Sequence, residues 1–254
     1  MNWHSRYLQQ AAWTRDLRVY LFEQAGLANA KRSVLEVGCG TGAVLCELTD
    51  PAAIHGLDLN PAALAECKIQ RPAVMLTQGD AFSLPYPDKS FDIVYCHFLL
   101  LWVNDPLQVI CEMARVGRTI LALAEPDYSQ RVDEPFELNV LGEWQAEALR
   151  RQGANPNFGG RLAETFYNSG VELIETGPIQ GQVVMRSSED WENEWLVIES
   201  DLEGSVTGQE IQKIKSLDQG ARSRNERPLC RFRSYRLGKD LQVRPNQNFE
   251  KRDV

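Results

Sequence analysis

The segment Ser33–Gly42 constrains the fold of this chain more than any other. It reads SVLEVGCGTG, in which a short apolar run leads into three glycines at alternate positions. Glycine has no Cβ, so it accepts a positive φ and lets the backbone approach a ligand closely. With a helix predicted at Thr41–Leu48, the pattern is a strand, a tight loop and a helix whose first N–H groups are free. The segment therefore predicts a nucleotide-binding loop, with an unrelated tight turn as the alternative.

Short apolar runs alternate with helical stretches over residues 33–124. Two helix starts are well marked, because Asn60-Pro61 and Asp105-Pro106 each place a capping side chain before a proline at the first helical position. Near-continuous apolar strands separated by helices are typical of a parallel sheet covered on both faces. We therefore predict strands at Val34–Val37, Ile54–Leu57, Val74–Leu76, Ile93–Cys96 and Ile120–Ala124, with helices at Thr41–Leu48, Pro61–Lys68 and Pro106–Val116.

The flanking regions are predicted to be mainly helical. Apolar residues at helical spacing predict one helix over residues 5–26, ended by Gly26. After Glu125 the pattern predicts helices at Glu134–Arg151, Arg161–Asn168 and Ser188–Gln219, two β segments within Val171–Val184 around Thr176-Gly177-Pro178, and a last strand at Leu229–Leu237. The polar end, residues 240–254, is expected to fray.

Composition limits the kind of protein. The chain has 254 residues, a formal net charge of −8 and six cysteines without a C-x-x-C pair. An acidic balance argues against nonspecific coating of nucleic acid, and scattered cysteines argue against a metal knuckle or a disulfide framework. The first residues lack the apolar stretch of a signal peptide, and the most apolar window, Ile93–Val103, is about half a membrane span. We expect a cytoplasmic protein with no metal and no membrane span; its oligomeric state is not predicted.

Two acidic residues narrow the choice of nucleotide. The glycines and Ala43 also satisfy the G-x-G-x-x-A pattern of dinucleotide-binding proteins. Glu36, two residues before Gly38, suits a ligand that carries an ammonium group and is poorly placed beside a pyrophosphate. Asp58 is expected to end the second strand, where a carboxylate can accept hydrogen bonds from ribose hydroxyls in either class of nucleotide. These residues favour a nucleoside ligand with a positive charge.

Three motifs in order resemble a known family. They are E-x-G-x-G-x-G at 36–42, the aspartate at 58, and G-D-A-x-x-L-P-x-x-x-x-S-F-D-x-V at 79–94. Together they resemble the class I S-adenosylmethionine-dependent methyltransferases, most closely the ubiquinone/menaquinone-type branch and other small-molecule enzymes. The resemblance covers about residues 33–125. It implies an α/β fold with a doubly wound, mostly parallel, seven-stranded Rossmann-like sheet and helical cap insertions. It also implies one domain over 1–254, with a cofactor-binding half at 1–125 and an acceptor and cap half at 126–239.

The resemblance also implies which residues bind the cofactor, S-adenosyl-L-methionine. This ligand carries a sulfonium, an ammonium and one carboxylate, so an acidic pocket suits it better than a phosphate cradle does. Glu36 and the loop residues Gly38, Cys39, Gly40, Thr41 and Gly42 would hold the methionine portion; Asp58 would bind the ribose and Leu59 would lie against the adenine; Asp80 would accept from the adenine amino group, with Ala81 and Phe82 completing that pocket; and Cys96 and His97 would add contacts from the fourth strand.

The predicted reaction is methyl transfer to a small-molecule acceptor by in-line displacement. The protein must align the reactants and exclude water, and a general base is needed only if the acceptor loses a proton. No catalytic residue is therefore assigned. His97 is either a general base or a structural histidine. Glu125 and Asp127 either face the acceptor or are turn and cap residues.

Aromatic residues in the helical regions also allow two interpretations. Trp144, Phe158, Phe166, Trp191 and Trp195 either line an apolar acceptor pocket or belong to the core. In the N-terminal helix, Tyr7, Trp13 and Arg15 belong either to a lid over the cofactor or to a packed cap.

Three other functions stay open. The run H-x-x-L-x-W-V-x-D-P at 97–106 resembles a bacterial enzyme that esterifies a carboxylated wobble uridine in tRNA. Residues 221–254, with ten basic and four acidic side chains, are a solvated segment, a segment docked on the acidic remainder of the chain, or a place for RNA or another acidic partner. An NAD(P)-dependent oxidoreductase is a second alternative, although the one Tyr-x-x-x-Lys spacing, Tyr235 to Lys239, contains a glycine. A non-catalytic S-adenosylmethionine-binding module is the third.

Overall fold

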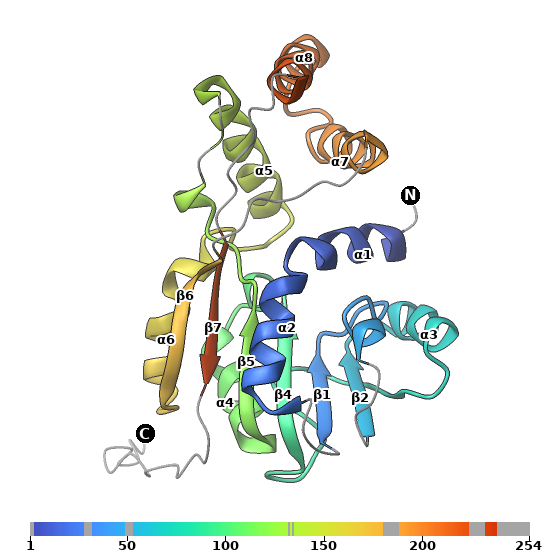
Figure 1. Cartoon of the computed structure of the whole chain (residues 1–254), viewed down its shortest axis with the longest axis vertical. Helices are drawn as coiled ribbons and strands as arrows, with labels where there is room; N and C mark the ends of the chain where they lie inside the picture. Colours follow the sequence, from blue (N-terminus) through green and yellow to red (C-terminus); the bar gives the residue numbers. More distant parts are fainter. Residues whose placement is uncertain are drawn as a thin grey trace, which may run out of the picture.

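Five parallel strands form the centre of the fold in a computed structural model (Figure 1). The structure describes residues 3–27, 32–48, 53–131, 133, 135–179, 188–223 and 232–237. The parallel strands are β1 (Ser33–Val37), β2 (Ala53–Asp58), β3 (Met75–Gln78), β4 (Phe91–His97) and β5 (Gly117–Leu123). Each overlaps one of the five predicted apolar runs, so the prediction of a parallel α/β sheet is confirmed.

Two further strands extend the sheet beyond β5. The strand order is β3-β2-β1-β4-β5-β7-β6, in which β7 (Phe232–Leu237) lies antiparallel to both β5 and β6 (Leu173–Ile179). The chain order reverses at β1, which pairs with β2 on one side and with β4 on the other. In open α/β sheets, ligands bind beyond the carboxyl ends of the strands at such a switch point. The topology therefore predicts a binding crevice above β1.

Helices cover both faces of the sheet and its carboxyl edge. They are α1 (Trp3–Trp13), α2 (Arg15–Gln24), α3 (Pro61–Gln70), α4 (Pro106–Val116), α5 (Asn139–Arg151), α6 (Leu162–Asn168), α7 (Ser188–Asp201) and α8 (Gly208–Ser223), with short 3-10 turns at η2 (Leu45–Glu47), η3 (Leu100–Trp102), η4 (Tyr128–Gln130), η5 (Phe136–Leu138) and η6 (Phe158–Arg161). The predicted caps are confirmed: Asn60 accepts the Ala62 and Ala63 N–H groups, and Asp105 accepts that of Gln108.

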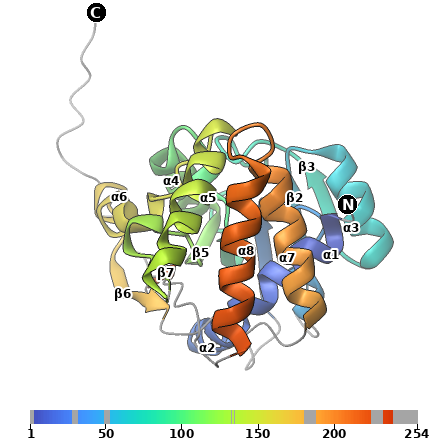
Figure 2. The same cartoon turned by 90° about the horizontal axis from the view of Figure 1, so that it is seen from above.

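The buried apolar residues form three clusters. One joins a sheet face to α4 and α6, and the second joins the opposite face to α2, α3 and the glycine loop. The third lies among α5, α7 and α8, which stand above the sheet (Figures 1 and 2). The helices above the crevice therefore have an apolar core of their own.

Several predicted elements were wrong in detail. Of the predicted helix at Thr41–Leu48 only the turn η2 forms, because Gly42 has φ +81° and a positive φ cannot continue a helix. The single helix over 5–26 is two helices that meet at Thr14, and the helix at 188–219 is two helices with Gly204 (φ +75°) between them.

The C-terminal strands also differ from the prediction. The strand β6 runs through Thr176–Pro178, which were predicted to separate two β segments. Proline is tolerated there because β6 is an edge strand that pairs only with β7 in this sheet. The rest of the second segment, residues 180–184, and the tail from Asp240 lie outside the described residues.

Candidate functional site

The glycine loop follows β1 and lies at the switch point of the sheet. Its three glycines have φ values of +74°, +52° and +81° at Gly38, Gly40 and Gly42. The carbonyl oxygen of Leu57 fixes the loop, because it accepts the Gly38 and Cys39 N–H groups at 2.8 and 3.0 Å. A Cβ at Gly40 would have no described heavy atom within 4 Å. The backbone at Gly40 therefore borders open space, as a loop that lies against a ligand must.

Asp58 joins this loop to the end of β2. Its Oδ2 accepts the Gly40 N–H at 2.7 Å, and its Oδ1 accepts the Asn60 N–H at 2.8 Å. The Gly79 N–H donates to the Asp58 carbonyl at 3.1 Å, so the end of β3 meets the same edge. The structure thus brings Gly40 and Asp58, predicted from separate motifs, into direct contact.

The residues predicted around the adenine lie on the same edge. The Leu59 side chain is 66% exposed and offers an apolar surface next to Asp58. Asp80 is exposed, and its Oδ1 accepts the Phe82 N–H at 2.9 Å in a tight turn. Ala81 and Phe82 are half-buried and pack against the core cluster of α4 and α6. The contacts of these four residues with an adenine ring stay a prediction.

Glu36 lies beneath the loop and is almost completely buried. The Tyr95 hydroxyl, on β4, donates to Glu36 Oε2 at 3.0 Å. Burial raises the pKa of Glu36 well above its usual range, although the hydrogen bond from Tyr95 and the charge of Arg18 act in the opposite direction. Such a carboxyl gains stability when a cation approaches, which is the role predicted for it beside an ammonium group.

The N-terminal helices are bonded to the site through a buried arginine that the sequence did not reveal. Arg18, on α2, is 0% exposed. Its Nε and Nη2 donate to the two carboxylate oxygens of Glu47 at 2.9 and 2.5 Å, and its Nη1 donates to Thr14 Oγ1 at 2.5 Å. Helical spacing identifies the apolar face of α2, but a charged residue on a helix is expected to face solvent, so no sequence signal pointed to Arg18.

His97 belongs to this same network. Its Nε2 lies 2.9 Å from Thr14 Oγ1 and 3.4 Å from Arg18 Nη1. Since arginine can only donate, Nε2 is the unprotonated acceptor nitrogen. Burial, and then the charge of Arg18, hold the pKa of His97 well below its usual range. These contacts favour the structural alternative for His97 over a general base.

Three other predicted residues are enclosed by protein. The Cys96 side chain is 0% exposed within the core, so its backbone is the part left for the predicted contact with the cofactor, which stays a prediction. Cys39 is also buried, and its thiol forms a hydrogen bond with the thiol of Cys67. This hydrogen bond and burial both raise the pKa of Cys39. Thr41 is buried beneath α1, where its Oγ1 lies 2.9 Å from His4 Nδ1.

Glu125 and Asp127 have structural roles at the end of β5. Glu125 is 0% exposed and accepts three backbone N–H groups, those of Leu99 and Leu100 at Oε1 and that of Leu101 at Oε2, at 3.0 to 3.1 Å. Asp127 caps η4 by accepting the Ser129 N–H at 3.1 Å. The structure therefore favours the turn and cap alternative for both residues, and Glu125 fixes the segment that follows β4.

Replacing Glu125 by glutamine is expected to lower the free energy of unfolding by about 1–3 kcal/mol, because an amide N–H₂ would face the Leu101 N–H and leave it without an acceptor. Burial raises the pKa of Glu125 to about 7, although the three N–H groups oppose the shift. The folded state thus binds the Glu125 proton more tightly than the unfolded state does. Near pH 5 the folded protein carries protonated Glu125, whose two oxygens can still accept N–H groups whereas an amide nitrogen cannot. The wild-type advantage over E125Q is therefore expected to be largest near pH 5 and to narrow as the pH rises through 7.

Chemical denaturation of both proteins from pH 5 to 8 measures this difference. Glu143→Gln, at an exposed position of α5, is the matched control and should leave both the midpoint and its pH dependence unchanged. A constant gap between wild type and E125Q at every pH would contradict the raised pKa, and no gap would contradict the role of the carboxylate.

The aromatic residues proposed for an acceptor pocket are mostly core residues. Phe158 and Phe166 are buried in the cluster with α4 and α6, and Trp195 is buried among α5, α7 and α8. The Trp195 Nε1–H donates to Asp218 at 2.7 Å, and Trp144 packs against the same cluster. The core alternative is therefore confirmed for Phe166 and Trp195.

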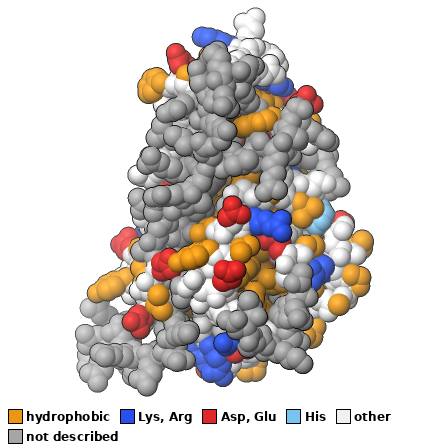
Figure 3. Space-filling model, viewed as in Figure 1, with side chains coloured by type: hydrophobic (Ala, Val, Ile, Leu, Met, Phe, Trp, Pro, Cys, Tyr) orange, Lys and Arg blue, Asp and Glu red, His pale blue; other side chains and the backbone are white. Residues whose placement is uncertain are grey.

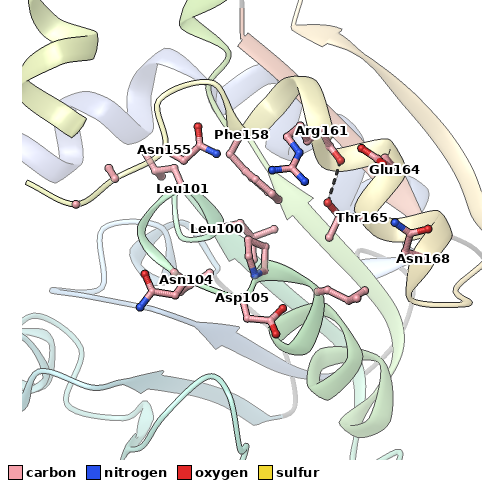
Figure 4. A pocket seen from close by; sticks show the side chains of 15 residues that line it. Leu100, Leu101, Asn104, Asp105, Asn155, Phe158, Arg161, Glu164, Thr165 and Asn168 are labelled. Atoms are coloured by element: carbon pink, nitrogen blue, oxygen red, sulfur yellow. Dashed lines mark hydrogen bonds between the residues drawn. The ribbon is translucent and has the colours of Figure 1, made fainter. Parts of the chain in front are cut away.

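A cavity of about 440 Å³ opens beside this edge, between η3 with the start of α4 and η6 with α6 (Figure 4). Leu100, Leu101 and Phe158 contribute apolar surface, and Asp105 and Arg161 contribute charged groups. None of the residues predicted to bind the cofactor lines it. In the part of the chain that the structure describes, no group of three or more His, Cys, Asp or Glu side chains could hold a metal ion.

Solved structures show the class of fold. The structure resembles a protein from Galdieria sulphuraria proposed to be a sarcosine dimethylglycine methyltransferase, with a TM-score of 0.55 and 14% identity over 91% of this chain and 84% of that one. It also resembles the [4+2]-cyclase SpnF, with a TM-score of 0.54 and 19% identity over 91% of this chain and 82% of that one. The fold is thus the Rossmann-like α/β fold of these proteins.

Sequence relatives identify the family. Residues 35–119 match the family model described as "Methyltransferase domain". The demethylmenaquinone methyltransferase of Renibacterium salmoninarum is 32% identical over 158 residues, which cover 60% of this chain and 66% of the relative. The phosphatidylethanolamine N-methyltransferase of Cereibacter sphaeroides is 40% identical over 91 residues, or 34% of this chain and 45% of the relative.

Over residues 35–119 the chain therefore matches the methyltransferase domain, and the predicted resemblance to the class I S-adenosylmethionine-dependent methyltransferases is confirmed. The family implies S-adenosylmethionine as the methyl donor. The chain spans about two thirds of the Renibacterium relative and about half of the Tropheryma whipplei one, for which the matched share is 54%.

Proposed function

We propose that this chain transfers a methyl group from S-adenosylmethionine to a small-molecule acceptor. The observation that carries the proposal is the contact between Gly40 and Asp58. It holds a carboxylate at the edge of a glycine loop whose backbone borders open space at the switch point of the sheet. This arrangement suits a nucleoside with a positively charged amino-acid tail, and the matched family uses that ligand.

The residues of the chain would bind, orient and shield the donor. S-adenosylmethionine, when bound, supplies a methyl carbon activated by its sulfonium. Asp58 would hold the ribose hydroxyls, Leu59 and Asp80 would hold the adenine, and Glu36 would favour the ammonium group from below the loop. The contact between His4 and Thr41 places α1 over the loop, where the helix would exclude water. No residue is assigned as general base.

The acceptor is proposed to be a small and lipophilic molecule. The names of the relatives specify demethylmenaquinone, phosphatidylethanolamine and phthiotriol dimycocerosates. These three compounds share a long hydrocarbon part. Among the described residues, no helix has both the length and the hydropathy to cross a bilayer.

An RNA acceptor is the less favoured alternative. Figure 3 shows the Lys and Arg side chains of the described part of one face in small groups, separated by acidic and hydrophobic ones, rather than in a continuous stripe. The side chains of the basic segment 222–254 lie outside the described residues.

The cytoplasmic location and the single domain also remain proposals. The free thiols of the five described cysteines agree with a reducing compartment.

Calorimetry and label transfer together test the proposal. We expect the chain to bind S-adenosylhomocysteine and not NAD⁺, and to move labelled methyl from S-adenosylmethionine into the lipid fraction of a cell extract. Binding of NAD⁺ alone would favour an oxidoreductase, and binding of the nucleoside without label transfer would favour a non-catalytic module. Label in the RNA fraction would replace the proposed acceptor class.

A further inference from the structure

The cavity between η3 and α6 has an apolar floor. Its volume of about 440 Å³ is within the range of small-molecule sites. The Leu100 and Leu101 N–H groups donate to the Glu125 carboxylate at 3.0 and 3.1 Å. The Leu101 carbonyl accepts the Asn155 N–H at 2.7 Å. Because these backbone groups are already paired, a ligand on the floor would meet the leucine side chains.

One wall of the cavity is a polar helix face. Four residues line it at positions i, i+3, i+4 and i+7, namely Arg161, Glu164, Thr165 and Asn168. Residues at this spacing lie on one face of a helix. The apolar residues of α6 turn the other way and belong to the core cluster with α4. The sequence of α6 therefore turns its polar face toward the cavity.

Arg161 and Asp105 place opposite charges on two walls. Figure 4 shows Arg161 on the side of η6, Asp105 at the start of α4, and Leu100 between them. Among the described residues, neither Arg161 nor Asp105 forms an ion pair. Asp105 Oδ1 accepts the Gln108 N–H at 3.0 Å, and within the described ranges Oδ2 accepts no hydrogen bond. A cationic and an anionic group thus remain for a ligand.

We propose that this cavity binds an aliphatic amino acid, which is a small zwitterion with an apolar side chain. The ligand carboxylate pairs with the Arg161 guanidinium, whose fork of N–H donors fits a carboxylate. The ligand ammonium pairs with Asp105, and the aliphatic part covers the leucine floor. None of the residues predicted to bind the cofactor lines the cavity, so this site does not depend on the proposed function.

Charge and polarity favour a zwitterion over other ligands. Glu164 lies one helical turn from Arg161, so a purely anionic ligand would meet two carboxylates around a single guanidinium. A purely cationic ligand would leave Arg161 without a counter-charge. Seven of the fifteen lining residues are polar or charged, which disfavours a long hydrocarbon chain.

Leucine and its two half-molecules test the charges separately. 4-Methylpentanoate is leucine without the ammonium group, and 3-methylbutylamine is leucine without the carboxylate. Backbone NMR of the isotope-labelled chain, titrated with each compound, measures both affinity and location. We expect leucine to shift the N–H signals of Leu100 and Leu101. It should bind about 10-fold more tightly than either half-molecule, because each half-molecule lacks one charged contact.

Two variants assign the charged contacts. Arg161→Gln should weaken leucine binding by about 10-fold and leave 3-methylbutylamine within about twofold of wild type. Asp105→Asn should weaken leucine to the same extent and leave 4-methylpentanoate unchanged. Asparagine caps a helix as well as aspartate does, so α4 should stay intact. Arg118→Gln and Asp16→Asn, at exposed positions of β5 and α2, are the matched controls and should bind leucine like wild type.

The location of binding separates this cavity from the cofactor site. S-adenosylhomocysteine also carries an amino-acid head, but leucine should still bind the cavity when that nucleoside saturates the glycine loop. Shifts at Gly40 without shifts at Leu100 and Leu101, equal affinity for leucine and either half-molecule, or no leucine binding would each overturn the inference. If leucine binds the cavity and S-adenosylhomocysteine does not bind at all, the inference stands and the proposed function fails.

Discussion

The Asp58→Ala variant is expected to bind S-adenosylhomocysteine at least about 100-fold more weakly than wild type, because two charge-assisted hydrogen bonds to the ribose would be lost. The substitution also removes the acceptor of the Gly40 N–H, which sets the shape of the loop. Gly40→Val should abolish binding by a different route. A β-branched residue is strained at φ +52°, and its side chain would enter the space that borders the loop.

Titration calorimetry measures both variants, with circular dichroism to show that they are folded. Asp16→Ala, at an exposed position of α2, removes the same kind of side chain away from the site and should bind like wild type. Wild-type affinity in both Asp58→Ala and Gly40→Val would mean that the nucleoside lies elsewhere in the molecule.

The second large effect is expected at Arg18. Replacing it by methionine should lower the free energy of unfolding by about 3–5 kcal/mol, because Glu47 would lose its buried partner and Thr14 and His97 would lose a hydrogen-bond donor. For a chain of this size the midpoint of thermal unfolding should fall by roughly 10 °C. Methionine keeps much of the apolar stem, so the loss would report on the charge network.

A double variant separates charge from packing. Arg18→Met combined with Glu47→Leu removes both partners, and replacing a buried ion pair by apolar residues is often neutral. We expect the double variant to recover at least half of the stability lost in Arg18→Met. If the double variant loses as much stability as the two single variants together, or if Arg18→Met alone is as stable as wild type, the ion pair does not hold α2 to η2.

The sequence alone was enough to predict the parallel sheet and the meeting of the glycine loop with the end of β2. Each strand of the parallel sheet combines an apolar run with flanking breakers, and the caps Asn60 and Asp105 depend only on their own neighbours along the chain. The contact between Gly40 and Asp58 followed from topology, since strands that are adjacent and parallel bring their carboxyl ends together. Local patterns of this kind predict the structure well because few contacts between distant residues override them.

The remaining parts of the site depend on contacts between distant residues. Arg18 bonds Glu47 across 29 positions, and Glu125 accepts N–H groups 24 to 26 residues earlier in the chain. No periodicity encodes such pairs, so a helical arginine was expected to face solvent and a glutamate after a strand left two interpretations open. The position of Cys96 at a strand end was correct, but no pattern along the chain indicated that its side chain is buried in the core.

The three separate apolar clusters have a consequence for stability. Helices α7 and α8 pack around Trp195 against α5, and a salt bridge from Arg6 on α1 to Glu194 on α7 links them to the first helix. Neither α7 nor α8 contributes a residue to the two clusters on the sheet. Losing the Trp195 side chain would therefore loosen these two helices while the apolar residues of the sheet stay buried.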